Sequence, residues 1–504
     1  MRFEALSRKL CQLDPTIRIV NSRNSRLCGL SDDSRKLRKG EVFAALTGSK
    51  ADGTRFVGAA VKAGASALLV QSEVGGVDLP QIVSARPRHT LALIAGLLNG
   101  EPAKHMRMVG VTGTKGKTTV AFLMREIFEQ CGVSCGLMGT VMNIIGQEQR
   151  AAAMTTPSAL DVQRMLAEMR ARAQSACAME ISSHALDQDR VAGVPFSGAI
   201  FTNLGHDHLD YHKTVSHYLD AKARLFEELD ENLGIALVNI DDPHGQEIFD
   251  RTRAGALRYG MSERADVRLT DLKMALDGMT FTIRWLGDAE RFVSPMTGRY
   301  NASNLCAVIG MALALDLPLA GIKRAVAGFK GAPGRLERVS GAGSGPLVFV
   351  DYAHTPDSLE NVLSTMREVC AGRRLTCVFG CGGDRDRTKR PKMGAIAAQL
   401  ANRVIVTSDN PRSENPNAIM EEIIGGIAPQ KQPVEALADR AAAIELAISQ
   451  AQSNDVVLIA GKGHETYQIF SDRTIHFDDR EEAAAALSRH WGLAASGRRE
   501  KAVR

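Results

Sequence analysis

The chain has 504 residues, of which 44% are hydrophobic and 24% charged, and its formal net charge is +5. This composition is ordinary for a soluble globular protein, and the length predicts about three domains. The small charge is compatible with an anionic small-molecule ligand, and it gives no support to a nucleic-acid-binding or membrane-surface protein.

The cysteines and the N-terminus indicate a cellular compartment. Nine cysteines are scattered along the chain without a Cys-x-x-Cys pair, which argues for reduced thiols and against a disulfide framework or a zinc site. The first residues lack the apolar core of a signal peptide, and no apolar run reaches about 18 residues. We therefore expect a cytoplasmic protein without membrane insertion or nucleic-acid partners, and we expect a monomer.

The predicted elements alternate between strand and helix. Residues 1–103 contain strand patterns at 40–46 and 65–70 and a helix at 54–64. Residues 104–332 open with a strand at 106–113 and a helix that has Gly132 as its C′ residue, followed by strands within 177–184, 198–208 and 235–242. In residues 333–504, four apolar runs end in polar loops, within 347–356, 375–387, 403–412 and 455–465.

These patterns predict an α/β protein of three domains. The first is a smaller mixed α/β domain, and the central domain has the parallel or mixed sheet of a P-loop ATPase. The third is a Rossmann-like, doubly wound domain. Breaks rich in Gly and Pro near residues 100–105 and 328–337 mark the boundaries.

The stretch "VGVTGTKGKTT", residues 109–119, is the strongest functional signal. Gly113 and Gly116 would let backbone N–H groups close on phosphate oxygens at a helix N-terminus. Lys117 would reach the β- and γ-phosphates, and the Thr118 hydroxyl would help to hold Mg²⁺. The general motif has glycine where this chain has Val111, so a glycine-rich turn is the alternative interpretation.

The phosphate loop resembles that of the Mur ligases, the ATP-dependent enzymes that build the peptidoglycan stem peptide. The resemblance continues in order along nearly the whole chain, and it is most specific to the members that add the third stem residue. It is carried by "DDSRKLRKGEVFAAL", "GSKADG", "MTTP", "MEISSHALDQDR", "NLGHDHLDYH", "YLDAKARLF", "GRYNASN", "PGRLE", "DYAHTPDSL", "GCGGDRDRTKRPKMG", "DNPR" and "AGKGHE".

The resemblance implies amide-bond formation through an acyl phosphate, with ATP and Mg²⁺ as cofactors. The catalytic residues would be Lys117, Glu180, His208 and Lys222, and the metal ligands Thr118, Glu180, His208 and Lys222. In the family the lysine at the place of Lys222 is carbamylated by CO₂. From the residues alone, Lys222 reads as a solvated helix lysine and His208 as a loop histidine.

The resemblance also implies the nucleotide-binding residues. Those expected to bind ATP are Gly113, Thr114, Lys115, Gly116, Lys117, Thr118, Thr119, Asn301, Asn304, Arg335 and Asp351. A helix N-cap fits Asn301 equally well. Those expected to bind the uridine-nucleotide substrate are Asp32, Ser34, Ser49, Lys50, Ala51, Met154, Thr155, Thr156, Ser182, Gln188 and Arg190. Met154 stands where the family usually has asparagine.

The loops after the strands of the third domain would form an amino-acid pocket, because ligands of open α/β sheets bind outside the carboxyl ends of the strands. The pocket residues would be Arg385, Asp409, Asn410, Pro411, Arg412, Gly461 and Glu465. Arg412 would bind the far carboxylate of meso-diaminopimelate, while Asp409 and Glu465 bind its far ammonium. The other substrate would be UDP-N-acetylmuramoyl-L-alanyl-D-glutamate.

Three alternatives stay open at this point. A lysine-adding ligase would leave Arg412 unpaired, and a folylpolyglutamate-type ligase would not need the motifs of the uridine-nucleotide domain. A P-loop switch protein would want Asn-Lys-x-Asp, and the nearest run is "VNIDDP" at 238–243.

Overall fold

A computed structural model describes residues 1–48, 52–205, 207–339, 345–370, 372–428 and 434–492. By packing, the chain divides into two compact units, Met1–Thr270 with Ile283–Glu290 and Ser303–Ala325, and Asp271–Thr282 with Arg291–Ala302 and Val326–Arg504. The boundaries expected at residues 103/104 and 332/333 stay predictions. The cysteines are free thiols, and among the described residues no helix combines the length and apolarity needed to span a membrane.

The N-terminal sheet has the strand order β1-β5-β4-β3-β2. Its strands are β1 (Arg18–Val20), β2 (Gly29–Ser31), β3 (Glu41–Ala44), β4 (Ala67–Val70) and β5 (Gln81–Val83), with the 3₁₀ helix η1 (Gly53–Phe56) and helices α1 (Phe3–Leu13), α2 (Val57–Lys62) and α3 (Pro87–Leu98). Strands β2 to β5 pair in parallel, and only β1 is antiparallel. The two faces alternate, since Val42 packs with α1 and α3 whereas Phe43 packs with α2.

The central sheet has the order β16-β15-β14-β13-β12-β11-β6-β10-β7-β8-β9. Its parallel strands include β6 (Arg107–Thr112), β7 (Cys135–Met138), β10 (Ala176–Glu180), β11 (Gly198–Phe201), β12 (Ile235–Asn239) and β13 (Gly255–Gly260). Strands β8 (Met142–Ile145) and β9 (Glu148–Ala151) follow at one edge, and β14 (Val267–Ala275), β15 (Gly278–Trp285) and β16 (Asp288–Ser294) at the other. The expected strands are present, whereas β7 to β9 and β13 to β16 were not anticipated.

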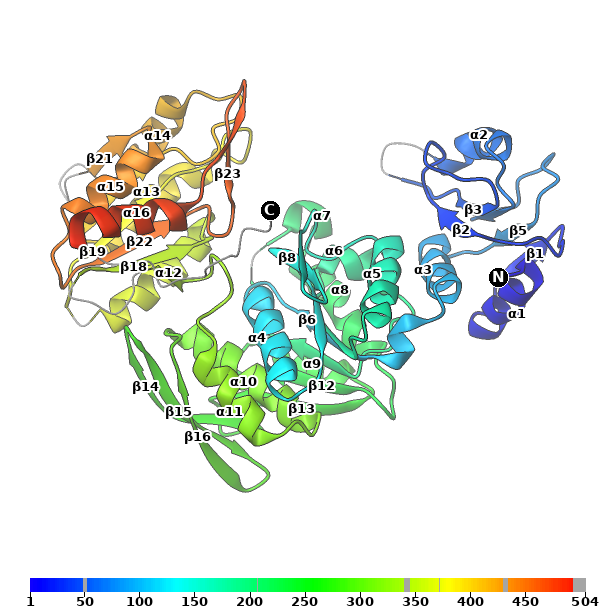
Figure 1. Ribbon diagram of the computed structural model, residues 1–504, viewed down its shortest axis with the longest axis horizontal. Coiled ribbons are helices and arrows are strands. Elements are labelled where there is room, and N and C mark those ends of the chain that lie inside the picture. Colours follow the sequence, from blue (N-terminus) through cyan, green and yellow to red (C-terminus); the bar gives the residue numbers. More distant parts are fainter. Residues whose placement is uncertain (49–51, 206, 340–344, 371, 429–433, 493–504) are drawn as a thin grey trace. The chain divides into compact units, whose positions relative to one another are not determined.

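The α-helices that accompany this sheet are labelled in Figure 1, and a 3₁₀ helix, η2, precedes them. These helices are η2 (Pro102–His105), α4 (Lys117–Gln130), α5 (Ala159–Ala171), α6 (Ser183–Asp187), α7 (Leu209–His212), α8 (Val215–Glu227), α9 (Gly245–Arg251), α10 (Arg299–Ala314) and α11 (Leu319–Gly328). Gly132 has φ +80° and follows the C-cap Cys131 of α4, as predicted.

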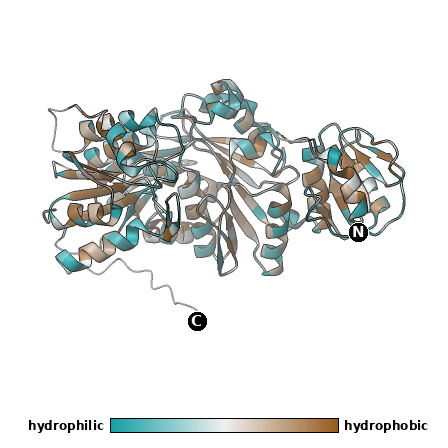
Figure 2. Cartoon of the chain, turned by 90° about the horizontal axis from the view of Figure 1, so that it is seen from above, coloured by the Kyte–Doolittle hydropathy of each residue, from teal (hydrophilic) through white to brown (hydrophobic). Residues whose placement is uncertain are grey.

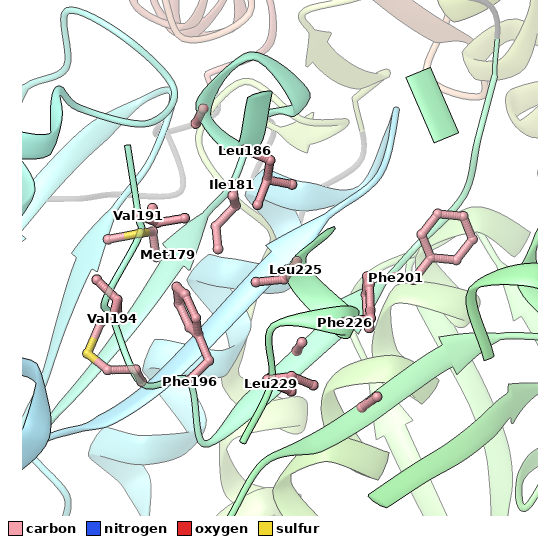
Figure 3. Close-up of a cluster of buried hydrophobic side chains, with 14 of the residues drawn as sticks. Met179, Ile181, Leu186, Val191, Val194, Phe196, Phe201, Leu225, Phe226 and Leu229 are labelled. Carbon is pink, nitrogen blue, oxygen red and sulfur yellow. The ribbon is translucent and has the colours of Figure 1, made fainter. Parts of the chain in front are cut away.

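A buried hydrophobic cluster fixes helix α8 against the central sheet (Figure 3). Phe226 of α8 meets Phe201 of β11 edge to face, with ring centroids 6.3 Å apart. Met179 of β10 and Phe196 belong to the same cluster. Burial of such side chains contributes about 1.5–3 kcal/mol each, so α8 has a well-defined position beside the strand ends that carry the polar residues.

The C-terminal sheet has the order β17-β18-β22-β19-β20-β21, and it is parallel apart from β17. Its strands are β17 (Glu337–Arg338), β18 (Leu347–Asp351), β19 (Leu375–Phe379), β20 (Arg403–Thr407), β21 (Val434–Leu437) and β22 (Val456–Ala460). The helices are α12 (Pro356–Val369), α13 (Lys389–Leu400), α14 (Pro416–Ile424), α15 (Arg440–Ser449) and α16 (Asp479–Trp491), and β23 (Tyr467–Ile469) pairs with β24 (Thr474–His476).

This domain is doubly wound, as predicted, because its four central strands β18, β22, β19 and β20 bury both faces. Val404 packs with α12, α13 and α14, whereas Ile405 packs with α15 and α16. Figure 2 shows the strands as mainly hydrophobic and the helices as mixed. The four strands β18, β22, β19 and β20 are neighbours and parallel, so the polar loops that follow them begin at one edge of the sheet.

Candidate functional site

The phosphate loop connects β6 to α4, and two glycines give it its shape. Gly113 and Gly116 have φ values of +148° and +90°. A Cβ atom on Gly113 would lie 1.9 Å from Oγ1 of Thr202, and one on Gly116 would lie 2.5 Å from Oδ1 of Asn304. Both positions therefore require glycine, and the N-terminus of α4 is a favourable place for an anion.

The side chains of the loop are held by its own carbonyl groups and by residues after β11. Nζ of Lys117 donates to the carbonyl oxygens of Gly113 at 2.8 Å and Thr114 at 3.0 Å. The backbone N–H of Lys115 donates to Oδ1 of Asn203 at 2.9 Å. The loop is thus braced with Lys117 close to its backbone, next to the buried first turn of α4 that contains Thr118 and Thr119.

Glu180 is fully buried at the end of β10, and hydroxyl groups surround its carboxylate. Oγ1 of Thr118 donates to it at 2.9 Å, and Thr140 donates through its backbone N–H at 2.8 Å and its hydroxyl at 3.0 Å. These hydrogen bonds offset the cost of burying the carboxylate and fix its orientation. The arrangement places the predicted pair Thr118 and Glu180 together.

Lys222 is buried, so its interpretation as a solvated helix lysine was wrong. The side chain is 1% exposed on α8, where Nζ donates to the carbonyl oxygen of Gly113 at 2.9 Å and lies 4.3 Å from the centroid of the Tyr218 ring. Burial, with a further contribution from the charge of Lys117, lowers the pKa of Lys222 well below its usual value. Burial therefore makes the charged form of Lys222 less favourable than it is for an exposed lysine.

His208 lies near the Tyr218 ring, which also contacts Lys222. It precedes α7 with a left-handed φ of 54°, and its ring centroid lies 6.2 Å from that of Tyr218 and 4.8 Å from that of His184. Its side chain is 45% exposed. His208 is thus accessible from solvent beside the ring that covers Lys222.

The chemistry of these donors fits Mg²⁺. In the part of the chain that the structure describes, no group of three or more His, Cys, Asp or Glu residues forms a metal site. The predicted set differs from such a group because it includes a hydroxyl and a lysine. The oxygens of Thr118 and Glu180 are 2.9 Å apart, and oxygen donors of this kind are the ones that Mg²⁺ prefers.

The residues predicted for the muramoyl-dipeptide end come together around Arg190. Its guanidinium donates to Oε1 of Gln188 at 2.8 Å, to the carbonyl of Thr156 at 2.9 Å and to the sulfur of Met154 at 3.5 Å. Thr156 Oγ1 accepts the N–H of Ser182 at 3.0 Å. Arg190 has no carboxylate within 4.0 Å among the described residues, so it is available to an anionic ligand.

Two further residues complete this group. The hydroxyl of Thr155 accepts a hydrogen bond from Thr140 at 3.1 Å, which links the group to Glu180. Met154 is 43% exposed, and its thioether is a weak acceptor. Met154, at the position where the family usually has asparagine, therefore offers Arg190 only a weak hydrogen-bond acceptor.

In the N-terminal domain, Asp32 and Ser34 follow the carboxyl end of β2. Strand β3 is parallel to β2, so the segment after β3 starts at the same edge. Ser49, Lys50 and Ala51 lie outside the described residues. The two described residues are accessible or partly accessible, as a surface site requires.

Asn301 and Asn304 are both buried in α10. Asn301 is not an N-cap, because the helix begins at Arg299, and its amide donates to the carbonyl of Thr297 at 2.9 Å. Asn304 packs against Gly116 of the phosphate loop. Of the two, Asn304 is the one that the structure places beside the nucleotide-binding segment.

Asp351 is the last residue of β18, and Arg335 lies just before β17. The carboxylate of Asp351 accepts the backbone N–H groups of Leu336 at 2.6 Å and Ala353 at 2.8 Å. The Arg335 guanidinium lies 4.8 Å from the centroid of the Tyr352 ring, and its Nε is buried without a partner among the described residues. Asp351 thus shapes the loop, while Arg335 retains an unused donor.

The residues predicted to form the amino-acid pocket lie at the carboxyl edge of the C-terminal sheet. Nδ2 of Asn410 donates to Oε2 of Glu465 at 2.9 Å. A Cβ atom on Gly461 would lie 2.9 Å from the Asp409 carboxylate, so these loops touch. Lys462, which the sequence interpretation did not include, is completely buried between them and binds Asn410 and Glu465.

Arg412 and Arg385 flank Gly382 in the neighbouring loop. A Cβ atom on Gly382 would lie 3.0 Å from Nη1 of Arg412 and 3.8 Å from Cγ of Arg385. Arg412 follows Pro411 with a left-handed φ of 51°, and Nη1 donates to the carbonyl of Gly383 at 2.7 Å. The loops at this edge of the sheet therefore carry guanidinium groups as well as carboxylates.

Thr140, Tyr218, Asn203 and Lys462 are the site residues that sequence reasoning missed. Thr140 follows β7, the neighbour of β10, and Asn203 follows β11. A rule that takes every polar residue after a parallel strand would have found both. The same rule would have found Lys462, which follows β22, whereas Tyr218 on α8 gives no such signal, because its role depends on which side chains meet in space.

A nucleotide-binding loop, a buried acid beside it and a two-signed pocket at the edge of a doubly wound sheet define a nucleotide-dependent ligase. The comparisons with known proteins agree. The Mur ligase middle domain matches residues 111–312, the Mur ligase glutamate ligase domain matches residues 334–463, and the Mur ligase family catalytic domain matches residues 27–95. The chain belongs to the Mur ligase family, and its three-domain α/β fold is the fold of that family.

Relatives of high similarity share one name, UDP-N-acetylmuramoyl-L-alanyl-D-glutamate--2,6-diaminopimelate ligase. The protein from Synechococcus sp. (strain WH7803) is 44% identical over 93% of this chain and 96% of its own, and that from Clostridium botulinum is 40% identical over 89% and 92%. A solved structure of that name is 34% identical, with a TM-score of 0.73 over 95% of this chain and 98% of that one.

Proposed function

We propose that the chain joins the amino group of meso-2,6-diaminopimelate to the D-glutamate carboxyl group of UDP-N-acetylmuramoyl-L-alanyl-D-glutamate. The reaction is a step of peptidoglycan precursor synthesis that converts ATP to ADP and phosphate. The observation that carries this assignment is that Arg412, Asp409 and Glu465 all lie in loops at the carboxyl edge of one parallel sheet. This set of charges matches the far end of diaminopimelate, which has both a carboxylate and an ammonium group.

The first step activates the acid. A carboxylate oxygen of the D-glutamate attacks the γ-phosphorus of ATP, and the bond from that phosphorus to the β,γ-bridging oxygen breaks. ADP departs, and the D-glutamate carboxyl group becomes an acyl phosphate. Lys117 and the N-terminus of α4 stabilise the charge that gathers on the phosphoryl oxygens. Mg²⁺ supplies further neutralisation of that charge when bound, and Thr118, Glu180, His208 and Lys222 would hold it.

The second step forms the amide. The amine of diaminopimelate attacks the activated carbonyl, the C–N bond forms, the bond to the phosphate oxygen breaks and the nitrogen loses a proton. Arg190 orients the muramoyl-dipeptide end, since its guanidinium has only neutral partners among the described residues. Positioning of this kind supplies a large part of the barrier reduction in ligation.

Carbamylation of Lys222 is part of this proposal. Reaction with CO₂ needs an unprotonated amine, and Lys222 is buried with the Gly113 carbonyl and the Tyr218 ring as its surroundings. The modified side chain would end in a carboxylate, an oxygen ligand beside the phosphate loop. The buried position supports this role better than a solvated one would.

The remaining assignments follow the same scheme. We infer that residues 1–103 bind the uridine nucleotide, that residues 104–332 bind ATP and that residues 333–504 bind the amino acid. We also infer that the chain acts as a cytoplasmic monomer. Lysine is the competing acceptor, and it lacks the carboxylate that would pair with Arg412.

Phosphate release is the deciding measurement. We expect release only when ATP, the UDP-linked dipeptide and meso-diaminopimelate are all present, and much slower release with L-lysine. Loss of one charge-assisted pair in Arg412→Gln should reduce kcat/KM for diaminopimelate by roughly tenfold or more. Equal rates with the two amino acids would contradict the role of Arg412, and release without the UDP-linked substrate would contradict the ligase assignment.

A further inference from the structure

Lys462 is a buried cation inside the pocket predicted to bind an ammonium group. Its side chain is 0% exposed, and Nζ lies 3.2 Å from Oε2 of Glu465, 3.1 Å from Oδ1 of Asn410 and 3.9 Å from Oδ1 of Asp409. A lysine is almost never fully buried unless it is paired. Each of its three partners is one of the residues assigned to the far end of the amino acid.

Lys462 connects loops that follow two strands which do not touch. Asp409 and Asn410 follow β20, and Glu465 follows β22, with β19 between these strands. Gly380, which follows β19, allows the chain at the end of β20 to lie close to it, since a Cβ atom on Gly380 would lie 2.2 Å from the carbonyl oxygen of Thr407. The ammonium of Lys462 thus links the two loops across the end of the middle strand.

The lysine also fixes the direction of the Asn410 amide. Oδ1 of Asn410 accepts hydrogen bonds from Nζ of Lys462 and from the N–H of Ile469 at 3.0 Å. Two donors at this atom determine which end of the amide is the oxygen. Nδ2 must therefore face Glu465, to which it donates at 2.9 Å.

These contacts leave a defined set of acceptors for a ligand. Oε2 of Glu465 is taken by Lys462 and Asn410, whereas its Oε1 and both carboxylate oxygens of Asp409 accept no hydrogen bond from the described residues. In the neighbouring loop, Nη1 of Arg412 donates a hydrogen bond to the carbonyl oxygen of Gly383. The formal charges of Asp409, Glu465, Lys462 and Arg412 sum to zero.

We propose that Lys462 is a positioning residue that determines specificity: it holds Asn410 and Glu465 in place and neutralises one of the two acids. The pocket then suits an amino acid whose far end is zwitterionic better than one whose far end is a lone ammonium. Without Lys462 the pocket would lose one positive charge and would favour a cationic end more strongly than it does with Lys462. The inference rests on the proposed function, since it concerns the same amino-acid pocket.

The test is Lys462→Met, which keeps the length and apolar stem and removes the charge. We expect KM for meso-diaminopimelate to rise at least about tenfold, because charged hydrogen bonds are of that order, while KM for ATP and for the UDP-linked substrate stays within about threefold. The preference for diaminopimelate over L-lysine should fall at least about tenfold. Where lysine gives no turnover, its inhibition constant against diaminopimelate replaces the rate.

Two control variants separate positioning from general damage. Arg374 pairs with the buried Asp455 at 2.7 Å, at the amino ends of β19 and β22. Arg374→Met removes this cation and should leave all KM values unchanged. Lys462→Arg keeps the charge and should retain the amino-acid preference of the wild type within about threefold. An equal loss for diaminopimelate and lysine in Lys462→Met would overturn the proposal.

Every outcome remains informative. If Lys462→Met does not fold, the proposal depends on Lys462→Arg, and a lost preference in that folded variant would overturn it. If the wild type releases no phosphate with diaminopimelate, the proposed function fails. If the wild type is active and the preference is unchanged in Lys462→Met, only the inference about Lys462 fails.

Discussion

At the scale of single residues, Lys222 shows how burial changes the chemistry of a common side chain. A lysine on an amphipathic helix is usually solvated, but α8 packs through Phe226 and Tyr218 and carries Lys222 inward with them. Its one hydrogen bond among the described residues is to a carbonyl oxygen. The local sequence could not predict this position, because it depends on how α8 packs beside the phosphate loop.

Lys222→Ala should reduce kcat by roughly two orders of magnitude, the usual cost of removing a group that stabilises transition-state charge. Short carboxylates such as acetate or propionate should restore part of the rate, because the vacated space would accept a carboxylate in place of the carbamate. Steady-state phosphate release with and without these additives measures both effects. Lys323→Ala, which removes an exposed lysine paired with Glu290, serves as the control and should show neither effect.

At the scale of elements, the two ends of α4 depend on glycine for different reasons. Gly116 and Gly132 have similar φ values of +90° and +80°. A Cβ atom on Gly116 would lie 2.5 Å from Oδ1 of Asn304, whereas one on Gly132 would meet no atom within 4 Å. The pair therefore separates the cost of a left-handed backbone from the cost of crowding at the phosphate loop.

Gly132→Ala should cost about 1 kcal/mol of stability and leave KM for ATP unchanged, because only the backbone preference is lost. Gly116→Ala should cost more and should also raise KM for ATP at least about tenfold, since the loop must shift away from Asn304. Urea unfolding together with ATP-dependent rates measures the two costs. The same change in KM for both variants would show that crowding at Asn304 has no role.

The elements also show what could be predicted from the sequence. Short apolar runs with a polar loop after them identified β6, β10, β18, β19, β20 and β22, and the loops that they position. Strands β14 and β15 were missed because their burial alternates between buried and half-exposed positions, which weakens an apolar pattern. The contacts of Thr140 and Lys462 could not be predicted, since strand order brings them to their partners and the sequence does not state that order.

At the scale of the whole molecule, the two compact units can be followed separately. The chain has two tryptophans, Trp285 in one unit and Trp491 in the other. Trp491 donates to the carbonyl of Ile448 at 3.2 Å, so its fluorescence will report on the packing of α16 on α15. In a Trp285→Phe background, Trp491 therefore reports the unfolding of the C-terminal unit alone.

His464 makes the stability of that unit sensitive to acid. Burial, with the charges of Arg335 and Arg480, lowers the pKa of His464 to about 4, against the partial opposition of Asp478. The unfolded chain takes up a proton near the ordinary value of 6.5, whereas the folded chain does so only near 4. The unfolded state thus binds more protons in this window, and the stability due to neutral His464 is present above 6.5 and is lost as the pH falls toward 4.

Lowering the pH from 7 to 5 should therefore reduce the free energy of unfolding of the C-terminal unit, and His464→Gln should remove up to about 2 kcal/mol of that reduction. Nδ1 of His464 has no partner among the described residues, so the substitution breaks no hydrogen bond at that atom. Urea unfolding followed by Trp491 at several pH values measures the slope. Parallel slopes for the two proteins would mean that His464 takes up its proton equally in the folded and unfolded states, and the acid sensitivity would then have to arise from the other histidines of the unit.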